Sequence, residues 1–217
     1  MSNEKTDIIK KIDIDTINRY SKRYEKHGMS IETLGWGSKE QQEYRFKQLL
    51  RVIDFKNKSI LDLGCGFGDL LGFLRSSGIE IKSYTGIDIN NDLVSEAKKR
   101  YPNENFLSKS LIDIDESMNN ADVVVMLGLL NFKQKDISNK EYASIMLEKA
   151  FRLTNVVLAV DFLSSKRFVG YPKEEFVFYY DPAYVLEEGF KLTETICLLH
   201  DYVPIPQQEM VLVLFKQ

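Results

Sequence analysis

Apolar and polar positions follow a helical period in the first part of the chain. Ile12, Ile17, Tyr20 and Tyr24 mark a weak helix, and residues 38–53 mark a stronger one, in which apolar side chains recur every three or four residues. Ser38 and Gln41 have the spacing of a capping box at its start. Residues 26–38 are too rich in glycine for a regular element, and we predict a loop or lid there.

From residue 59 onwards, short apolar runs alternate with helical patterns. Strands separated by helices, each with a non-alternating apolar run, predict a parallel sheet covered on both faces. The predicted strands are Ser59–Leu63, Tyr84–Ile89, Asn105–Ser108, Asp122–Leu127 and Val156–Phe162. The predicted helices are Asp69–Ser76, Asp92–Arg100 and Lys140–Leu153, the last preceded by a second capping box of Ser138 and Glu141.

The last 40 residues have a different pattern. Asp181 and Pro182 are typical of the start of a short helix, which Gly189 would end. Two strand-like runs follow, Phe190–Leu199 and Glu209–Phe215. We therefore predict a doubly wound α/β fold with a mostly parallel, seven-stranded sheet that is closed by an antiparallel C-terminal hairpin strand.

Composition narrows the class of protein. The 217 residues carry a net charge of −3 without a long basic block, which argues against a nucleic-acid partner. No signal segment or membrane-spanning run is apparent, and two cysteines suit a reducing cytoplasm, where we expect the protein. We predict a helical lid at residues 1–57 and one compact binding domain at residues 58–217. We assign no metal ligands, and the oligomeric state stays open.

A glycine-rich loop follows the first predicted strand, with glycines at positions 64, 66 and 68. It lacks the Lys-Ser or Lys-Thr of a phosphate-binding loop. A dinucleotide fingerprint would require a third glycine where Asp69 stands. Asp62 and Asp69 flank the loop and would repel a diphosphate. A ligand with a positive centre and no phosphate fits better.

The stretch "ILDLGCGFG" resembles the first motif of the class I S-adenosylmethionine-dependent methyltransferases. A second signal, "YTGIDIN", ends a predicted strand with Asp88, 20 residues after Gly68 (88 − 68), where an acidic residue binds ribose hydroxyls. The segment "ADVVVMLGLLNF" is similar to the fourth motif of this family. The resemblance implies a Rossmann-like methyltransferase fold, S-adenosylmethionine as cofactor, and a lid of the type found in small-molecule methyltransferases.

The resemblance also implies roles for individual residues. Asp62, Gly64 and Gly66 would hold the methionine end of the cofactor, with Cys65 as a small apolar filler between them. Asp88 would bind the ribose. The other positions implied in cofactor binding are Ile89, Ser110, Leu111 and Gly128 in the domain, and Trp36 and Arg45 in the lid. Arg45 would pair with the methionine carboxylate.

The acceptor side is less defined. We predict a small metabolite or sugar-like acceptor, since the polar-Pro-Pro-aromatic motif of nucleobase methyltransferases is replaced by "GLLNF". Lys166, Arg167 and Lys173 suggest that the acceptor is anionic. The candidate catalytic residues are His200, Asn131 and Tyr24, with His27 and Asp201 as further possible bases. The candidate acceptor-binding residues are Asn131, Phe162, Tyr179, Tyr180, His200 and Tyr202, with Trp36 as a further wall.

Two other functions stay open at this level. One is a methyltransferase-like scaffold that binds the cofactor without turnover. The other is a nicotinamide-dependent oxidoreductase on a similar sheet, which would have to tolerate Asp69 in the loop.

Overall fold

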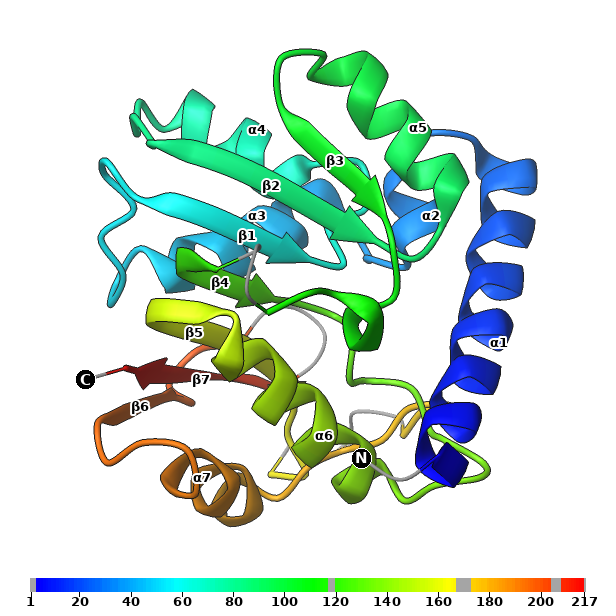
Figure 1. The fold of residues 1–217 in the computed structure, drawn as a ribbon, viewed down its shortest axis with the longest axis vertical. Helices are drawn as coiled ribbons and strands as arrows, with labels where there is room; N and C mark the ends of the chain where they lie inside the picture. The colour runs from blue at the N-terminus through cyan, green and yellow to red at the C-terminus, as the bar shows by residue number, and fades with distance from the viewer. Residues whose placement is uncertain (1–2, 117–119, 167–172, 204–207, 217) are drawn as a thin grey trace.

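The computed structural model describes residues 3–116, 120–166, 173–203 and 208–216. Seven strands form one sheet in the order β3-β2-β1-β4-β5-β7-β6 (Figure 1). Their bounds are β1 Ser59–Leu63, β2 Ser83–Asp88, β3 Asn105–Ser108, β4 Ala121–Met126, β5 Thr154–Leu163, β6 Ile196–Leu199 and β7 Glu209–Phe215. The helices are α1 Asn3–His27, α2 Ile31–Leu34, α3 Lys39–Leu49, α4 Asp69–Ser76, α5 Asn91–Arg100, the 3₁₀ turn η1 Leu111–Asp113, α6 Asn139–Arg152 and α7 Pro182–Phe190.

The strand directions confirm the predicted fold class. β1 to β5 are mutually parallel, and β7 pairs antiparallel with both β5 and β6. β6 therefore has the same direction as β1, and β7 alone is reversed. The chain reverses its order in the sheet between β1 and β4, which is where ligands bind in open α/β sheets.

Helices cover both faces of the sheet. Each strand contributes to the packing on both faces, because its successive side chains point to opposite sides. Leu61 and Leu63 of β1 pack in a cluster with α6 and α7, whereas Ile60 packs in a second cluster with α3, α4 and α5. β4, β5 and β7 divide their apolar side chains between these two clusters in the same alternating way. Asp62 lies on the strand position that faces the α3–α5 side.

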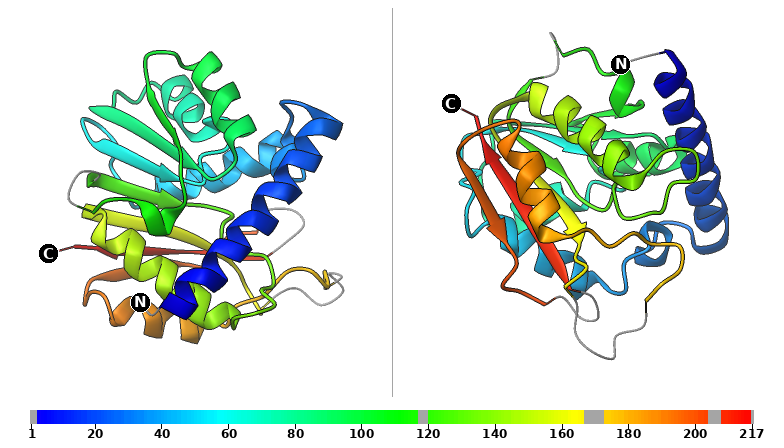
Figure 2. Two further views of the ribbon diagram at one scale, coloured as in Figure 1. Left: turned by 45° about the vertical axis from the view of Figure 1, so that its right-hand side comes forward. Right: turned by 90° about the horizontal axis from the view of Figure 1, so that it is seen from below.

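Helix α1 crosses the carboxyl ends of the parallel strands, along the edge at the right of Figure 1. Glu4 in its first turn and Lys26 in its last complement the helix dipole. The two further views show that α1 stands against this edge rather than on a face of the sheet (Figure 2).

Among the helices described, none combines the length and the apolar character needed to cross a bilayer.

Polar contacts hold both halves of α1. The Tyr24 hydroxyl donates to Glu96 of α5 at 2.7 Å, and Lys11 pairs with Asp136 beyond β4 at 2.6 Å. Since α5 and the segment after β4 lie on opposite sides of the switch point, α1 spans the region where the ligand of such a sheet binds.

Several predicted elements need correction. The segment at 26–38 was predicted to be irregular, but α1 extends to His27 and α2 forms one turn that ends at Gly35 in a left-handed conformation (φ 78°). Gly189 does not end α7, which continues to Phe190; a Cβ at Gly189 would lie 3.0 Å from Leu214 of β7. Glycine is used there because helix and sheet approach closely. Only residues 196–199 of the predicted run 190–199 form a strand.

Other local predictions are confirmed. Ser38 accepts a hydrogen bond from the Gln41 amide, and Ser138 accepts one from the Glu141 amide, each at the start of its helix. Asp181 caps α7 through the Ala183 amide. Short-range capping patterns were predicted correctly because donor and acceptor are only two or three residues apart in sequence.

Candidate active site

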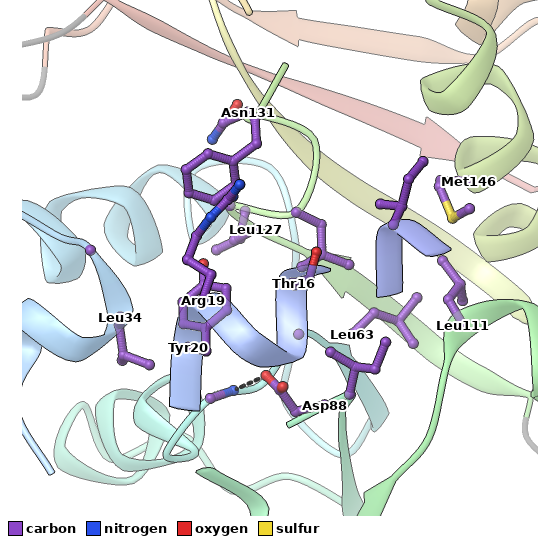
Figure 3. Close-up of a pocket in the computed structure, with 18 of the residues that line it drawn as sticks. Thr16, Arg19, Tyr20, Leu34, Leu63, Asp88, Leu111, Leu127, Asn131 and Met146 are labelled. Atoms are coloured by element: carbon purple, nitrogen blue, oxygen red, sulfur yellow. Dashed lines mark hydrogen bonds between the residues drawn. The ribbon is translucent and has the colours of Figure 1, made fainter. Parts of the chain in front are cut away.

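A cavity of about 830 Å³ lies between α1 and the carboxyl ends of the central strands. Its size lies within the range of small-molecule sites, about 300–1,000 Å³. Figure 3 shows Thr16, Arg19 and Tyr20 entering it from α1, with Asp88 on one side and Asn131 on the other. The cavity therefore has a floor made of strand ends and a roof made of the lid helix.

The glycine loop forms part of this floor. Gly64, Gly66 and Gly68 all have left-handed backbones, with φ of 78°, 52° and 75°. A Cβ at Gly64 would overlap Leu129, and one at Gly66 would lie 2.8 Å from Leu34. The loop thus requires glycine both for its conformation and for the close approach of side chains from the lid and from the segment after β4.

Asp88 fixes this loop from the neighbouring strand. One oxygen of its carboxylate accepts from the Gly66 amide at 2.9 Å, and the other accepts from the Asn90 amide at 2.9 Å. Burial raises the pKa of Asp88, and these backbone hydrogen bonds oppose that rise. Asn90, not Asp88, caps α5, because its side chain accepts from the amides of Asp92 and Leu93. Asp88 has no capping role and faces the cavity.

Asp62 is a buried carboxylate beneath the loop, with 5% of its surface exposed. The Tyr84 hydroxyl donates to it at 2.5 Å. Burial raises the pKa of Asp62 to about 7, with smaller contributions from the charges of Asp88 and Asp69. Asp69 also lines the cavity, but its charge is balanced by Arg100 at 2.5 Å. Asp88, and Asp62 where the pH is high enough to remove its proton, therefore carry most of the negative potential at the loop.

This floor suits a cationic nucleoside. Two carboxylates close to the loop would repel a diphosphate, and they would attract a sulfonium or an ammonium group. Among the described residues, no group of three or more His, Cys, Asp or Glu side chains is arranged to hold a metal ion.

The comparisons with known proteins agree with the chemistry of this floor. Residues 60–154 match the family described as "Methyltransferase domain". A Mycobacterium tuberculosis protein whose name calls it a methyltransferase, without stating its acceptor, is 30% identical over 152 residues, which are 66% of this chain and 86% of that protein. This chain is a class I S-adenosylmethionine-dependent methyltransferase. Its cofactor is S-adenosylmethionine.

Other relatives show how widely the family varies. The ribosomal RNA small subunit methyltransferase A of Mesomycoplasma hyopneumoniae is 30% identical over 135 residues, and the chain spans only 46% of its length. Among solved structures, the S-adenosylmethionine complex of magnesium protoporphyrin IX methyltransferase from Synechocystis has a TM-score of 0.66 at 14% identity, covering 100% of this chain and 99% of that one. This second likeness shows a shared fold.

The cofactor residues implied by the sequence come together in the methyltransferase. All eleven line the cavity, namely Trp36, Arg45, Asp62, Gly64, Cys65, Gly66, Asp88, Ile89, Ser110, Leu111 and Gly128. A Cβ at Gly128 would lie 3.2 Å from the Trp36 ring, so this lid residue covers the loop after β4. Their individual roles stay predictions.

Arg45 is placed differently from what its implied role requires. Its guanidinium donates from Nε to both carboxylate oxygens of Glu209, at 2.8 and 2.7 Å, and from Nη1 to the Gln41 carbonyl at 2.8 Å. The Trp36 ring covers it, with 4.4 Å between the ring centroid and Cζ. Arg45 is 4% exposed and Glu209 is 1% exposed. The charge of Arg45 is thus already balanced within the protein.

The expected acceptor and catalytic residues separate into two groups. Asn131 lines the cavity, and its side-chain oxygen accepts from the Leu163 amide at 3.2 Å. The others do not line it: these are Tyr24, Phe162, Tyr179, Tyr180, His200 and Tyr202. His200 directly follows a strand of the expected direction, but this strand, β6, is the fourth from β1, about 19 Å away at the usual strand spacing.

The remaining aromatic residues have structural contacts. The Tyr180 hydroxyl donates to the Leu130 carbonyl at 3.0 Å, and its ring packs edge-on against Phe162 with centroids 5.0 Å apart. Tyr202 is buried beside Tyr44. The Tyr179 hydroxyl accepts from the Glu174 amide at 3.3 Å. From the same connection, Glu174, Phe176 and Val177 do reach the cavity.

Sequence reasoning missed the polar face of α1. Asp13, Thr16, Tyr20 and Arg23 follow one another at helical spacing and line the cavity, together with Arg19. Asp13 accepts from the Ser110 hydroxyl at 2.6 Å, and burial raises its pKa to about 6. The apolar period of this segment predicts a helix, but it does not indicate that the opposite, polar side faces a ligand site.

Proposed function

We propose that this methyltransferase transfers the methyl group of S-adenosylmethionine to a small-molecule acceptor that binds beneath α1, beside Asn131 and Phe132. The observation that carries the proposal is the roof. α1 crosses the cavity and is held to α5 and to the segment after β4 by side-chain contacts. A folded macromolecule would have to displace this helix to reach the floor, whereas a small molecule fits within the enclosed volume.

Residues of the floor would hold the cofactor. Asp88 would accept from ribose hydroxyls through the lone pairs that the Gly66 and Asn90 amides leave free. Asp62 and the glycine loop would lie at the methionine end, and Trp36 would cover it from the lid. This division agrees with the charges, because the buried carboxyl group of Asp62 would lie at the end of the ligand that carries the sulfonium and the ammonium.

When bound, the cofactor supplies a methyl group that its sulfonium has already activated for displacement. The chain then has to exclude water and to hold the acceptor in line, which is catalysis by proximity. Leu34, Trp36 and Leu129 provide apolar surface at the junction of lid and floor. The two histidines and Asp201 do not line the cavity. This supports an acceptor whose attacking atom needs no histidine to remove a proton.

Calorimetry with S-adenosylmethionine and then a by-product assay would test the proposal. We expect the wild-type protein to bind the cofactor, and Asp62→Ala and Asp88→Ala to bind it much less. Turnover should occur with dialysable metabolite pools. One relative is named for ribosomal RNA, so RNA and protein fractions are tested in parallel. Methylation confined to those fractions would refute a small-molecule acceptor.

A further inference from the structure

Most arginines in the described part of the chain are paired with carboxylates. Seven arginines are described, and five of them form ion pairs: Arg45, Arg51, Arg75, Arg100 and Arg152. Arg19 and Arg23 are the two exceptions. Both are on α1, four residues apart, and both line the cavity. The unpaired guanidinium groups are therefore concentrated in the site.

Arg19 has a defined orientation there. Its guanidinium carbon lies 3.9 Å from the centroid of the Phe132 ring, in a stacking contact. Figure 3 shows the side chain extending from α1 toward Leu127 and Asn131, on the side of the cavity that follows β4. A stacked guanidinium keeps its five N–H donors in the plane of the group, and within the described residues none of them has an acceptor.

Phe132 belongs to a short aromatic wall. Its ring stacks with that of Phe176, with centroids 6.3 Å apart and an interplanar angle of 28°. Backbone hydrogen bonds join the two segments, from the Lys133 amide to the Phe176 carbonyl at 3.0 Å and from the Phe178 amide to the Asn131 carbonyl at 2.9 Å. Phe176 is 56% exposed although it lines the cavity. The wall thus offers apolar surface beside a free cation.

We propose that Arg19 determines specificity by binding an anionic group of the acceptor, a carboxylate or a phosphate, while the Phe132–Phe176 wall contacts an apolar or aromatic body. The inference rests on the proposed small-molecule function and names its substrate class. Carboxylates and phosphates match the planar N–H pairs of arginine with two parallel hydrogen bonds. A half-buried guanidinium without a protein partner recovers its lost hydration when such an anion binds.

The sequence suggested an anionic acceptor from three other residues. Lys166 pairs with Asp181 at 3.5 Å, Lys173 does not line the cavity, and Arg167 lies outside the described residues. Arg23 is also unpaired, but its guanidinium lies beside Gly35 and over the Tyr20 ring, with 5.6 Å between Cζ and the ring centroid. Arg19 is therefore the arginine whose contacts are with the segment beyond β4.

Matched pairs of probes can test this assignment. Binding of benzoate and 2-naphthoate to the S-adenosylhomocysteine complex is compared with binding of benzamide and 2-naphthamide, and phenyl phosphate is added as a second anion. We expect the anions to bind the wild-type complex roughly ten- to a hundredfold more tightly than the amides. Arg19→Gln should remove this preference, and Arg19→Lys should keep part of it. Arg152→Gln, which removes an arginine at the end of α6 that does not line the cavity, should leave it unchanged.

Three outcomes would overturn the assignment. One is the absence of any preference for anions in the wild-type complex, and another is an unchanged preference in Arg19→Gln. The third concerns the carboxylate of the cofactor itself. If Arg19→Gln weakened binding of S-adenosylhomocysteine but not of methylthioadenosine, which lacks the amino acid, Arg19 would serve the cofactor. Failure of the wild-type protein to bind S-adenosylhomocysteine at all would instead refute the proposed function, and this inference with it.

Discussion

The carboxylate of Asp88 accepts a hydrogen bond from the Gly66 amide at 2.9 Å. This contact joins the loop after β1 to the end of β2. It therefore links the glycine-rich motif directly to the motif that contains Asp88. The same carboxylate holds the Asn90 amide, at the start of α5. The loop is thus fixed by the residue expected to bind the ribose, so that little ordering is left for the cofactor to impose.

Asp88→Ala should reduce affinity for S-adenosylhomocysteine by roughly a hundredfold or more, because charge-assisted hydrogen bonds to the ribose and to the loop are both lost. Calorimetry measures the effect. Asp122→Ala is the matched control, since Asp122 accepts from the amide and hydroxyl of Ser59 at the opposite edge of the sheet. It should lower stability and leave affinity unchanged. Equal losses of affinity in both variants would show that Asp88 acts only through stability.

Gly64→Ala should abolish cofactor binding and destabilise the fold by more than the cost of a left-handed alanine, because its Cβ would overlap Leu129. Gly78→Ala separates the two effects. Gly78 has a similar φ of 70° with no atom within 4 Å of the added Cβ. It should lose only about 1–2 kcal/mol and keep its affinity. Chemical denaturation and calorimetry measure both quantities. If Gly64→Ala behaved like Gly78→Ala, the close approach at the loop would be irrelevant to binding.

The predicted site residues that do line the cavity are mostly those whose position follows from local pattern. Asp62, Gly64 and Asp88 stand at strand ends, and the carboxyl ends of neighbouring parallel strands meet at one edge whatever the rest of the chain does. His200 also ends a strand, but its distance from the site depends on where β6 enters the sheet. That order depends on contacts between segments far apart in the chain, so local patterns in the sequence do not indicate it.

Ion pairs between distant segments are also not indicated by local sequence patterns, and Arg45 is an example. Its helix and its direction toward the site were foreseen, but its partner Glu209 is 164 residues away in the chain and begins the last strand. A buried carboxylate supplied by a distant strand changes an arginine from a candidate ligand into half of an ion pair. Arg19 is the opposite case, since the absence of any described partner for its guanidinium became visible only in three dimensions.

Glu209→Gln should destabilise the protein by about 3–5 kcal/mol, because it removes the carboxylate that pairs with the buried guanidinium of Arg45. The double variant Arg45→Met/Glu209→Met should recover much of this loss, since neither member of the ion pair is then left buried without the other. It should also bind S-adenosylhomocysteine within a few-fold of wild type, as expected if Arg45 supports the Trp36 side of the lid. If the double variant regained stability but lost much of its affinity, this would indicate that Arg45 binds the methionine carboxylate of the cofactor.

Asp62→Asn should stabilise the unliganded protein, and more so at pH 8 than at pH 5. Burial raises the pKa of Asp62 from 3.8 to about 7, so between these values the folded chain holds a proton that the unfolded chain has released. Stability from this group is therefore fully present below pH 3.8 and is lost as the pH rises through 7. The loss corresponds to at most about 4 kcal/mol. Asparagine removes the charge and keeps an oxygen that can accept from Tyr84.

Denaturation at the two pH values, with calorimetry at pH 8, measures this effect and its consequence for binding. Asp62→Asn should gain roughly 1–4 kcal/mol at pH 8 and bind S-adenosylmethionine more weakly, because the charge that costs stability is the one that attracts the cation. Asp122→Asn should show the opposite sign at pH 8, since hydrogen bonds from Ser59 lower the pKa of Asp122 and stabilise its charged form. Two results would contradict the idea that burial destabilises the charged form of Asp62. One is an Asp62→Asn variant that is less stable than wild type at pH 8. The other is a gain in stability that does not vary between pH 5 and pH 8.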